Sequence, residues 1–243
     1  MVLKPSLYED LFESEEAHWW HISKRNASLA LIKRFLQVKS PRLLDIGCGT
    51  GKNIESFSTL GKVWGIDYSE QAIKFCRTRG LQNIILAEAG NIPFCSESFD
   101  VITMLDVLEH LEEDKTLEEV VRILKPKGLL IVTVPAYQSL WSQWDLQLHH
   151  LRRYNKKALQ LILRKNDLSI LKISFMYSFL IIPAIFIRGV KSRLYGENYP
   201  SDFRISSPFI NWLAKFIARL ESHLILHFYV PFGLSLITVA QKR

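Results

Sequence analysis

The stretch RLLDIGCGTGKN, residues 42–53, determines how the rest of the sequence is interpreted. An apolar run ends there in an acid, Asp45, and three glycines follow, Gly47, Gly49 and Gly51. Glycine lets a backbone turn tightly and approach a ligand, because no side chain stands in the way. The stretch therefore predicts a β-strand, a ligand-binding loop and the start of a helix. The dinucleotide fingerprint G-x-G-x-x-G would need glycine at Lys52, so an NAD enzyme is the less favoured alternative.

A second apolar strand follows in the stretch KVWGIDYSEQAI and ends in Asp67. This acid comes about twenty residues after the first, where a carboxylate can accept hydrogen bonds from both ribose hydroxyls of an adenosine. Ser69 is predicted to cap the helix that begins at Glu70, which leaves Asp67 available to a ligand.

Together these motifs resemble those of the class I S-adenosylmethionine (SAM) dependent methyltransferases, of the type 11 or 12 methyltransferase domain. The stretch ILAEAGNIPFCSESFDVITMLDVLEHL, residues 85–111, is similar to the part of that family that holds adenine and forms the fourth strand. It departs from the common pattern by the longer acid Glu88 and by Gly90. The resemblance implies SAM as cofactor, bound by Asp45, Gly47, Gly49, Gly51, Asp67, Tyr68, Glu88, Ala89 and Leu105.

The N-terminal stretch HWWHISKR is similar to an aromatic pair and arginine of the ubiquinone-pathway O-methyltransferases, a related group. By that resemblance Trp19 and Trp20 form a lid, with Trp20 over the cofactor and Trp19 toward the substrate. Arg25 would then pair with the methionine carboxylate of SAM. The alternative is that both tryptophans are core residues.

The stretch LWSQWDLQLHHLRRY supplies the candidate catalytic residues. Methyl transfer needs donor and acceptor to be aligned, and a hydroxyl acceptor also needs a base. His150 is the candidate base, with Asp145 as the group that orients it; a purely structural histidine is the alternative. Arg152 and Arg153 could hold a phosphate or carboxylate of the acceptor, with Tyr154 beside them.

Neither a disulfide framework nor a metal site is predicted. The three cysteines, Cys48, Cys76 and Cys95, form no Cys-x-x-Cys pair, which is consistent with a reducing compartment. The N-terminus has none of the features of a signal peptide, so we expect a cytoplasmic protein.

The predicted fold class is α/β, with a Rossmann-like, doubly wound sheet. Apolar strands at 43–46, 63–66, 84–87, 101–105 and 129–134 alternate with helices, which favours a parallel sheet covered on both faces. The family resemblance implies seven strands, the last antiparallel between the fifth and the sixth. We expect a SAM-binding core with its lid helix at 1–175, a helical insertion at 176–232 and the final strand at 233–243.

The charge of the chain is unevenly distributed. Residues 1–150 hold 16 Lys and Arg against 20 Asp and Glu, whereas residues 151–243 hold 15 against 4. Such an asymmetry suggests a nucleic acid or an anionic membrane surface as partner. The uncharged run 173–187 is shorter than the roughly 20 residues of a membrane-spanning helix.

The insertion is predicted to contain an amphipathic helix. An apolar stripe comprises Ile210, Leu213, Ile217, Leu220 and Leu224. Basic residues that could meet anionic lipid are Arg188, Lys191, Arg193, Lys215 and Arg219. Packing of this helix on the core is the alternative.

The leading functional hypothesis is a SAM-dependent methyltransferase that transfers a methyl group to an amphiphilic or lipid-linked acceptor at the inner surface of the cytoplasmic membrane. No nucleic-acid partner is expected, because the basic residues are interleaved with long aliphatic runs. One alternative is a soluble O- or N-methyltransferase of a sugar or small metabolite, with the insertion as a homodimer interface. Another is a non-catalytic, SAM-binding peripheral membrane protein.

Overall fold

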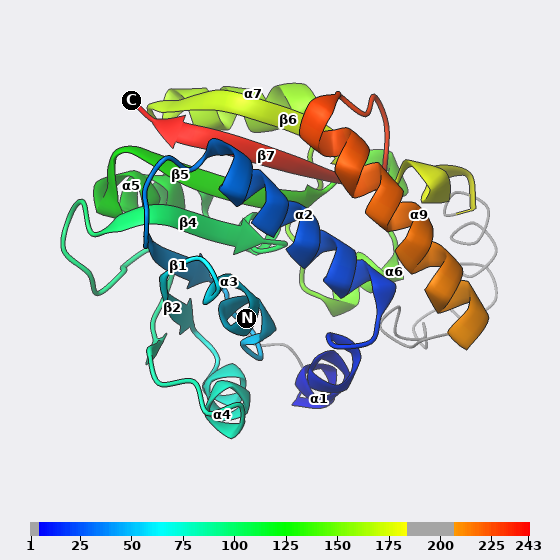
Figure 1. Ribbon diagram of the computed structural model, residues 1–243, viewed down its shortest axis with the longest axis horizontal. Coiled ribbons are helices and arrows are strands. Elements are labelled where there is room, and N and C mark those ends of the chain that lie inside the picture. Colours follow the sequence, from blue (N-terminus) through cyan, green and yellow to red (C-terminus); the bar gives the residue numbers. More distant parts are fainter. Residues whose placement is uncertain (1–4, 184–206) are drawn as a thin grey trace.

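A computed structural model of the chain describes residues 5–183 and 207–243 (Figure 1). The first half contains α1 (Pro5–Ser14), α2 (Trp19–Phe35), β1 (Arg42–Ile46), α3 (Lys52–Phe57), β2 (Lys62–Asp67), α4 (Glu70–Thr78), β3 (Ile84–Leu86), β4 (Phe99–Leu105), η1 (Leu108–His110) and α5 (Glu113–Ile123). The second half contains β5 (Leu124–Pro135), η2 (Gln138–Leu140), α6 (Gln143–Gln147), α7 (Lys156–Lys165), β6 (Leu168–Met176), η3 (Ser178–Leu180), α9 (Pro208–His227) and β7 (Ser235–Lys242).

The strands form one seven-stranded sheet in the order β3-β2-β1-β4-β5-β7-β6. Strands β1 to β5 pair in parallel, and β7 runs antiparallel to both of its neighbours, β5 and β6. The predicted α/β, Rossmann-like sheet with an antiparallel seventh strand is therefore confirmed. Ser69 also caps α4 as predicted, because its hydroxyl accepts a hydrogen bond from the backbone N–H of Ala72.

A separate hydrophobic core covers each face of the sheet. Leu44 in β1 belongs to the core beneath α5 and α7, whereas its neighbour Leu43 belongs to the core beneath α2 and α3. Successive side chains of a strand point to opposite faces, so a strand buried on both sides needs apolar residues at most of its positions. This requirement explains why the strands read as continuous apolar runs rather than as alternating patterns.

Helix α9 lies along α2 on one face of the sheet (Figure 1). Its buried residues are Ala214, Ala218, Glu221 and Ile225, so small side chains let the two helices approach closely. Asn211 fixes the start of α9 to the start of α2: its Oδ1 accepts the N–H of Trp19, and its Nδ2 donates to the carbonyl of Ala17.

The apolar stripe predicted for α9 is not the face with which this helix contacts the core. Ile210, Leu213, Leu220 and Leu224 are exposed. None of the helices in the described residues is long and apolar enough to span a membrane. Arg188, Lys191 and Arg193, in the predicted insertion, lie outside the described residues.

Replacing Glu221 by alanine is expected to destabilise the fold by about 1–3 kcal/mol, the usual cost of leaving a buried donor without its partner. Its buried carboxylate accepts hydrogen bonds from the backbone N–H groups of Tyr177 and Ser178 and from the Ser178 hydroxyl. Urea unfolding followed by circular dichroism measures the loss. Arg219→Ala, an exposed change on the same helix, should stay within about 0.5 kcal/mol, and an equal loss in both variants would contradict the assignment.

Candidate cofactor and acceptor site

A large cavity, of about 1190 Å³, opens beside the carboxyl ends of the parallel strands. Residues that follow β1, β2, β4 and β5 line it, and α2 contributes side chains from Trp19 to Arg25. The chain reverses its direction of winding between β1 and β4, which are neighbours in the sheet. Open α/β sheets bind ligands at such a switch point, so the cavity is the candidate functional site.

The glycine loop after β1 forms one wall of the cavity through Gly47 and Gly49. Gly47 has a φ of +66°, and a Cβ there would lie 2.5 Å from a methyl group of Val107, so only glycine fits. Gly51 has a φ of +92° and begins α3, where a Cβ would meet Leu81 at 2.4 Å. Gly51 is not among the residues that line the cavity; it turns the chain into the helix.

Asp67, at the end of β2, presents a buried carboxylate to the cavity. Its two oxygens accept the backbone N–H groups of Gly49 and Ser69, both at 2.9 Å. Each carboxylate oxygen has two lone pairs, so each can accept one further hydrogen bond. The side chain is thereby held rigidly with two acceptor positions available to a ligand.

The other acids of the predicted cofactor site are placed differently. Asp45 is buried beneath the loop, where it accepts a hydrogen bond from Thr103, and it does not line the cavity. Burial raises its pKa to about 7, against the opposing effect of that hydrogen bond. Glu88 is exposed and lines the cavity together with Ala89, Tyr68 and Leu105.

The predicted lid residues come from the start of α2. The ring of Trp20 stacks on that of Tyr177 with centroids 4.1 Å apart, and Trp19 meets both rings edge to face. Both tryptophans are half-buried and line the cavity, as does Arg25, whose guanidinium donates to the carbonyl of Glu15. Their predicted roles toward cofactor and substrate remain predictions.

A cluster of buried polar residues follows β5 in the chain. It lies in the part of the cavity where the methyl acceptor is predicted to bind, which is called the acceptor side below. The Nδ1 of His150 lies 2.8 Å from Oδ1 of Asp145, and Arg153 donates to both oxygens of the same carboxylate. Burial by itself would raise the pKa of Asp145, but the hydrogen bonds from His150 and Arg153 hold it well below its usual range. Asp145 is thus ionised and can accept an N–H from Nδ1; in the tautomer that donates from Nδ1, Nε2 carries no hydrogen.

The three predicted acceptor-binding residues that follow His150 serve other contacts. Arg153 lines the cavity, but its guanidinium is occupied by Asp145. Arg152 pairs with Glu113 at 2.9 Å, and the Tyr154 hydroxyl donates to the other oxygen of that carboxylate. Neither Arg152 nor Tyr154 is among the residues that line the cavity.

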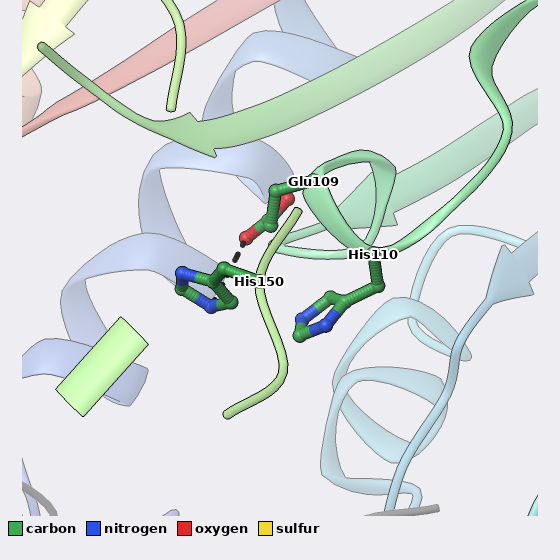
Figure 2. A group of neighbouring side chains, drawn as sticks. All are labelled: Glu109, His110 and His150. Atoms are coloured by element: carbon green, nitrogen blue, oxygen red, sulfur yellow. Dashed lines mark ion pairs between the residues drawn. The ribbon is translucent and has the colours of Figure 1, made fainter. Parts of the chain in front are cut away.

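Two residues that the sequence analysis did not single out face His150 across the cavity wall (Figure 2). Glu109 and His110 belong to η1, directly after β4. The Oε1 of Glu109 lies 4.0 Å from Nε2 of His150, and the rings of His110 and His150 meet edge to face with centroids 4.7 Å apart. The sequence marks Glu109 and His110 only by their position directly after the fourth strand, whose carboxyl end lies at the edge of the cavity.

Residues 44–132 match the family profile described as a methyltransferase domain. This part of the chain is similar to methyltransferase domains. The fold of the chain is also that of solved methyltransferases. A SAM-dependent methyltransferase from Methanosarcina mazei superposes with a TM-score of 0.56 at 19% identity, covering 87% of this chain and 96% of that one. A chain from the Haloferax volcanii complex of the Trm112 methyltransferase activator with a methyltransferase gives a TM-score of 0.63 at 18% identity, covering 98% and 93%.

The cofactor of the methyltransferase domain is SAM, as the sequence predicted. The cavity fits this molecule. The loop at Gly47 offers bare backbone where a Cβ would collide, and Asp67 offers two acceptor positions for ribose hydroxyls. At about 1190 Å³ the cavity exceeds the range of about 300–1,000 Å³ that is usual for one small ligand, which leaves room for an acceptor beside the cofactor.

The curated relatives match only part of this chain. The tRNA (carboxymethyluridine(34)-5-O)-methyltransferase of Arabidopsis thaliana is 36% identical over 110 residues, which are 42% of this chain and 27% of that protein. The Bos taurus protein named Probable tRNA methyltransferase 9B is 29% identical over 135 residues, which are 53% of this chain and 29% of that protein. The chain thus spans less than a third of the length of these relatives.

These comparisons contradict the predicted partners. The partners predicted from the sequence were a small-molecule or lipid-linked acceptor, an anionic membrane surface or a second copy, and no nucleic acid. The relatives are instead named for tRNA, and a structural neighbour comes from a complex with Trm112. The reason for the error is physical: a surplus of Lys and Arg attracts any polyanion, so charge alone does not distinguish lipid headgroups from nucleic-acid phosphates.

Proposed function

We propose that this protein is a SAM-dependent methyltransferase and that its acceptor is a nucleoside of an RNA. The observation that carries the transfer reaction is the arrangement of one cavity: the glycine loop and Asp67 line one part of it, and His150, whose Nδ1 is held by the buried Asp145, lines another. A cofactor and an acceptor bound there would lie side by side, and alignment of the two reactants is the main contribution of a protein to such a transfer.

The residues on the acceptor side have a clear division of roles. SAM supplies an electrophilic methyl group when bound. Nε2 of His150 faces the cavity as a base and can receive a proton from the acceptor. Asp145 fixes the ring through Nδ1 and stabilises the positive charge that the ring gains, while Arg153 keeps this carboxylate ionised. Trp19, Trp20 and the neighbouring part of α2 exclude water from the cavity mouth.

The RNA acceptor is supported by the names of the relatives and by the charge of this chain. Residues 151–243 hold 15 Lys and Arg against 4 Asp and Glu, an excess that would attract the phosphates of a polynucleotide. The cavity is also lined by flat rings, including Trp20, Trp144 and His110. Aromatic and imidazole rings stack on bases that are splayed out of a single-stranded RNA loop.

The proposal is tested by incubating the purified protein with methyl-labelled SAM and a total tRNA preparation. Label should enter acid-precipitable material and should be released by ribonuclease. An equal mass of DNA and a lipid extract serve as competing acceptors. Label that enters only lipid or small metabolites would show that RNA is not the acceptor, and no transfer to any fraction would exclude the methyltransferase activity itself.

A further inference from the structure

Glu109 is the most unusual polar residue in the cavity wall. It is fully buried, and neither of its carboxyl oxygens has a hydrogen-bond partner among the described residues. A buried carboxylate without a partner is costly, so the neutral acid is favoured. Burial, and then the nearby Asp106, raises the pKa of Glu109 well above its usual range. Glu109 therefore presents a carboxylic acid whose hydrogen has no acceptor within the described protein.

Two imidazole rings lie beside this acid (Figure 2), and the charges of Asp106, Lys24 and Arg153 also act on it. His150 turns Nε2 toward it, because Asp145 holds the opposite nitrogen. Burial, and then His150, lower the pKa of His110 to about 4, so its ring is neutral at neutral pH. One ring nitrogen of each histidine and one carboxyl oxygen of Glu109 lie within 4.8 Å of one another.

The spacing of these three atoms decides what they can hold. Zn²⁺ binds nitrogen and oxygen at about 2.0–2.2 Å, so two of its ligand atoms lie no more than about 4.4 Å apart. An oxygen atom held by hydrogen bonds of about 2.8 Å can contact partners up to about 5.6 Å apart, so it fits among three atoms that lie within 4.8 Å of one another. The cluster as it stands can hold an oxygen atom, and the 4.0 Å between Glu109 and His150 also lies within the range for two ligands of one metal ion.

We propose that Glu109, His110 and His150 bind the hydroxyl group that receives the methyl group, and that the protein is therefore an O-methyltransferase. This inference rests on the proposed methyl transfer but not on RNA as the acceptor. The hydroxyl donates its hydrogen to Nε2 of His150, and its oxygen accepts hydrogen bonds from Glu109 and from His110 in the tautomer that donates.

In the methyl transfer that follows, every proton and electron pair is accounted for. The hydroxyl proton passes to Nε2 of His150 as the oxygen uses a lone pair to form a bond with the methyl carbon. The bond between that carbon and sulfur breaks, and the sulfur keeps the electron pair and becomes a neutral thioether. Glu109 and His110 stabilise the negative charge that develops on the oxygen, Asp145 stabilises the imidazolium, and this proton then leaves to water.

The first experiment identifies the atom that is methylated. The protein is incubated with carbon-13 methyl-labelled SAM and an unfractionated cell extract that contains RNA and small metabolites. The chemical shift of the labelled methyl group then distinguishes an ether from an ester, an N-methyl group and a C-methyl group. A methyl ether supports the proposal, whether it is found in RNA or in a small molecule. Any other linkage, or the absence of a labelled product, overturns it.

The second experiment uses matched variants. Glu109→Gln, His110→Gln and His150→Gln should each lower the turnover number by about a hundredfold or more, since acid–base groups contribute about 10²–10⁴. The affinity for SAM, measured by calorimetry, should change less than about threefold. The control, His223→Gln, makes the same change on the exposed side of α9 and should keep full activity. Full activity in Glu109→Gln would overturn the proposal.

The wild type and the Glu109→Gln variant also test whether the cluster binds a metal ion. Dialysis against a chelator should leave turnover unchanged, and calorimetry with Zn²⁺, Mn²⁺ and Mg²⁺ should show no binding that Glu109→Gln removes. Loss of activity on dialysis, restored by one of these ions, would replace the hydroxyl site with a metal centre. Because this readout uses any labelled product, its outcome is separate from the question of whether RNA is the acceptor.

Discussion

Replacing Asp145 by alanine is expected to lower the free energy of unfolding by about 3–5 kcal/mol, the usual loss when one partner of a buried ion pair is removed. The Asp145 side chain is fully buried, and its carboxylate holds the guanidinium of Arg153 through two hydrogen bonds. It also accepts the N–H and the hydroxyl hydrogen of Ser142, which begins α6. Alanine would leave a buried guanidinium without a counter-charge.

Urea unfolding at neutral pH measures this effect, with the slope of the transition checked for constancy. Asp114→Ala is the matched control, because it removes an acid from an exposed pair with Lys165, and such pairs contribute about 0–1 kcal/mol. The double change Asp145→Ala with Arg153→Met should recover part of the loss, since no unpaired charge remains. Equal losses in Asp145→Ala and Asp114→Ala would contradict the assignment.

The pH dependence of the Asp145 contribution follows from its lowered pKa. The native state favours the ionised form relative to the unfolded chain, so the stabilisation is complete above the ordinary aspartate value of about 3.9. It is lost progressively as the pH falls below that value toward the lower pKa of the native state. The difference in stability between the wild type and Asp145→Ala should therefore be constant from about pH 5 upward and should shrink in acid.

Replacing Asp67 by alanine is expected to weaken SAM binding by about 30- to 1000-fold, or about 2–4 kcal/mol. The change removes the acceptor for two ribose hydroxyls, each worth about 1.5–3 kcal/mol, and water recovers part of the loss. It also leaves the N–H groups of Gly49 and Ser69 without the oxygens that position the loop. Isothermal titration calorimetry gives the dissociation constants directly.

Asp67→Asn separates charge from geometry, because the amide keeps one acceptor oxygen and the same volume. Its affinity for SAM should lie between those of the wild type and the alanine variant. Asp114→Ala, a surface acid outside the cavity, should bind SAM as the wild type does. Wild-type affinity in a folded Asp67→Ala protein would place the ribose elsewhere in the cavity.

Much of the cofactor side could be predicted from the sequence because its signals are local. A strand, its terminal acid and the glycines that follow are adjacent in the chain, and their conformations depend on neighbouring residues. The α/β sheet order with its antiparallel seventh strand was confirmed. Gly51 and Asp45 show the limit of this reasoning: both belong to the motif, but one begins a helix and the other is buried beneath the loop.

The acceptor side was less accessible to sequence reasoning. Arg152 and Arg153 are adjacent, but Arg152 pairs with Glu113 and Arg153 pairs with Asp145. The local sequence does not show which arginine contacts which acid. The apolar stripe of α9 is equally ambiguous, because a helix can bury either its large residues or its small ones. Here Ala214 and Ala218 are buried, since they permit close approach to α2.

The sequence alone thus determined the strand, loop and helix of the glycine motif, because turns, caps and apolar runs act over a few residues. Only the tertiary structure decided which groups meet across the cavity. Glu109 and His150 are 41 positions apart in the numbering and come from loops after β4 and β5, which are neighbours in the sheet. Parallel pairing of those strands brings both loops to one edge, where the buried acid of Glu109 lies beside Nε2 of His150 and has no hydrogen-bond partner among the described residues.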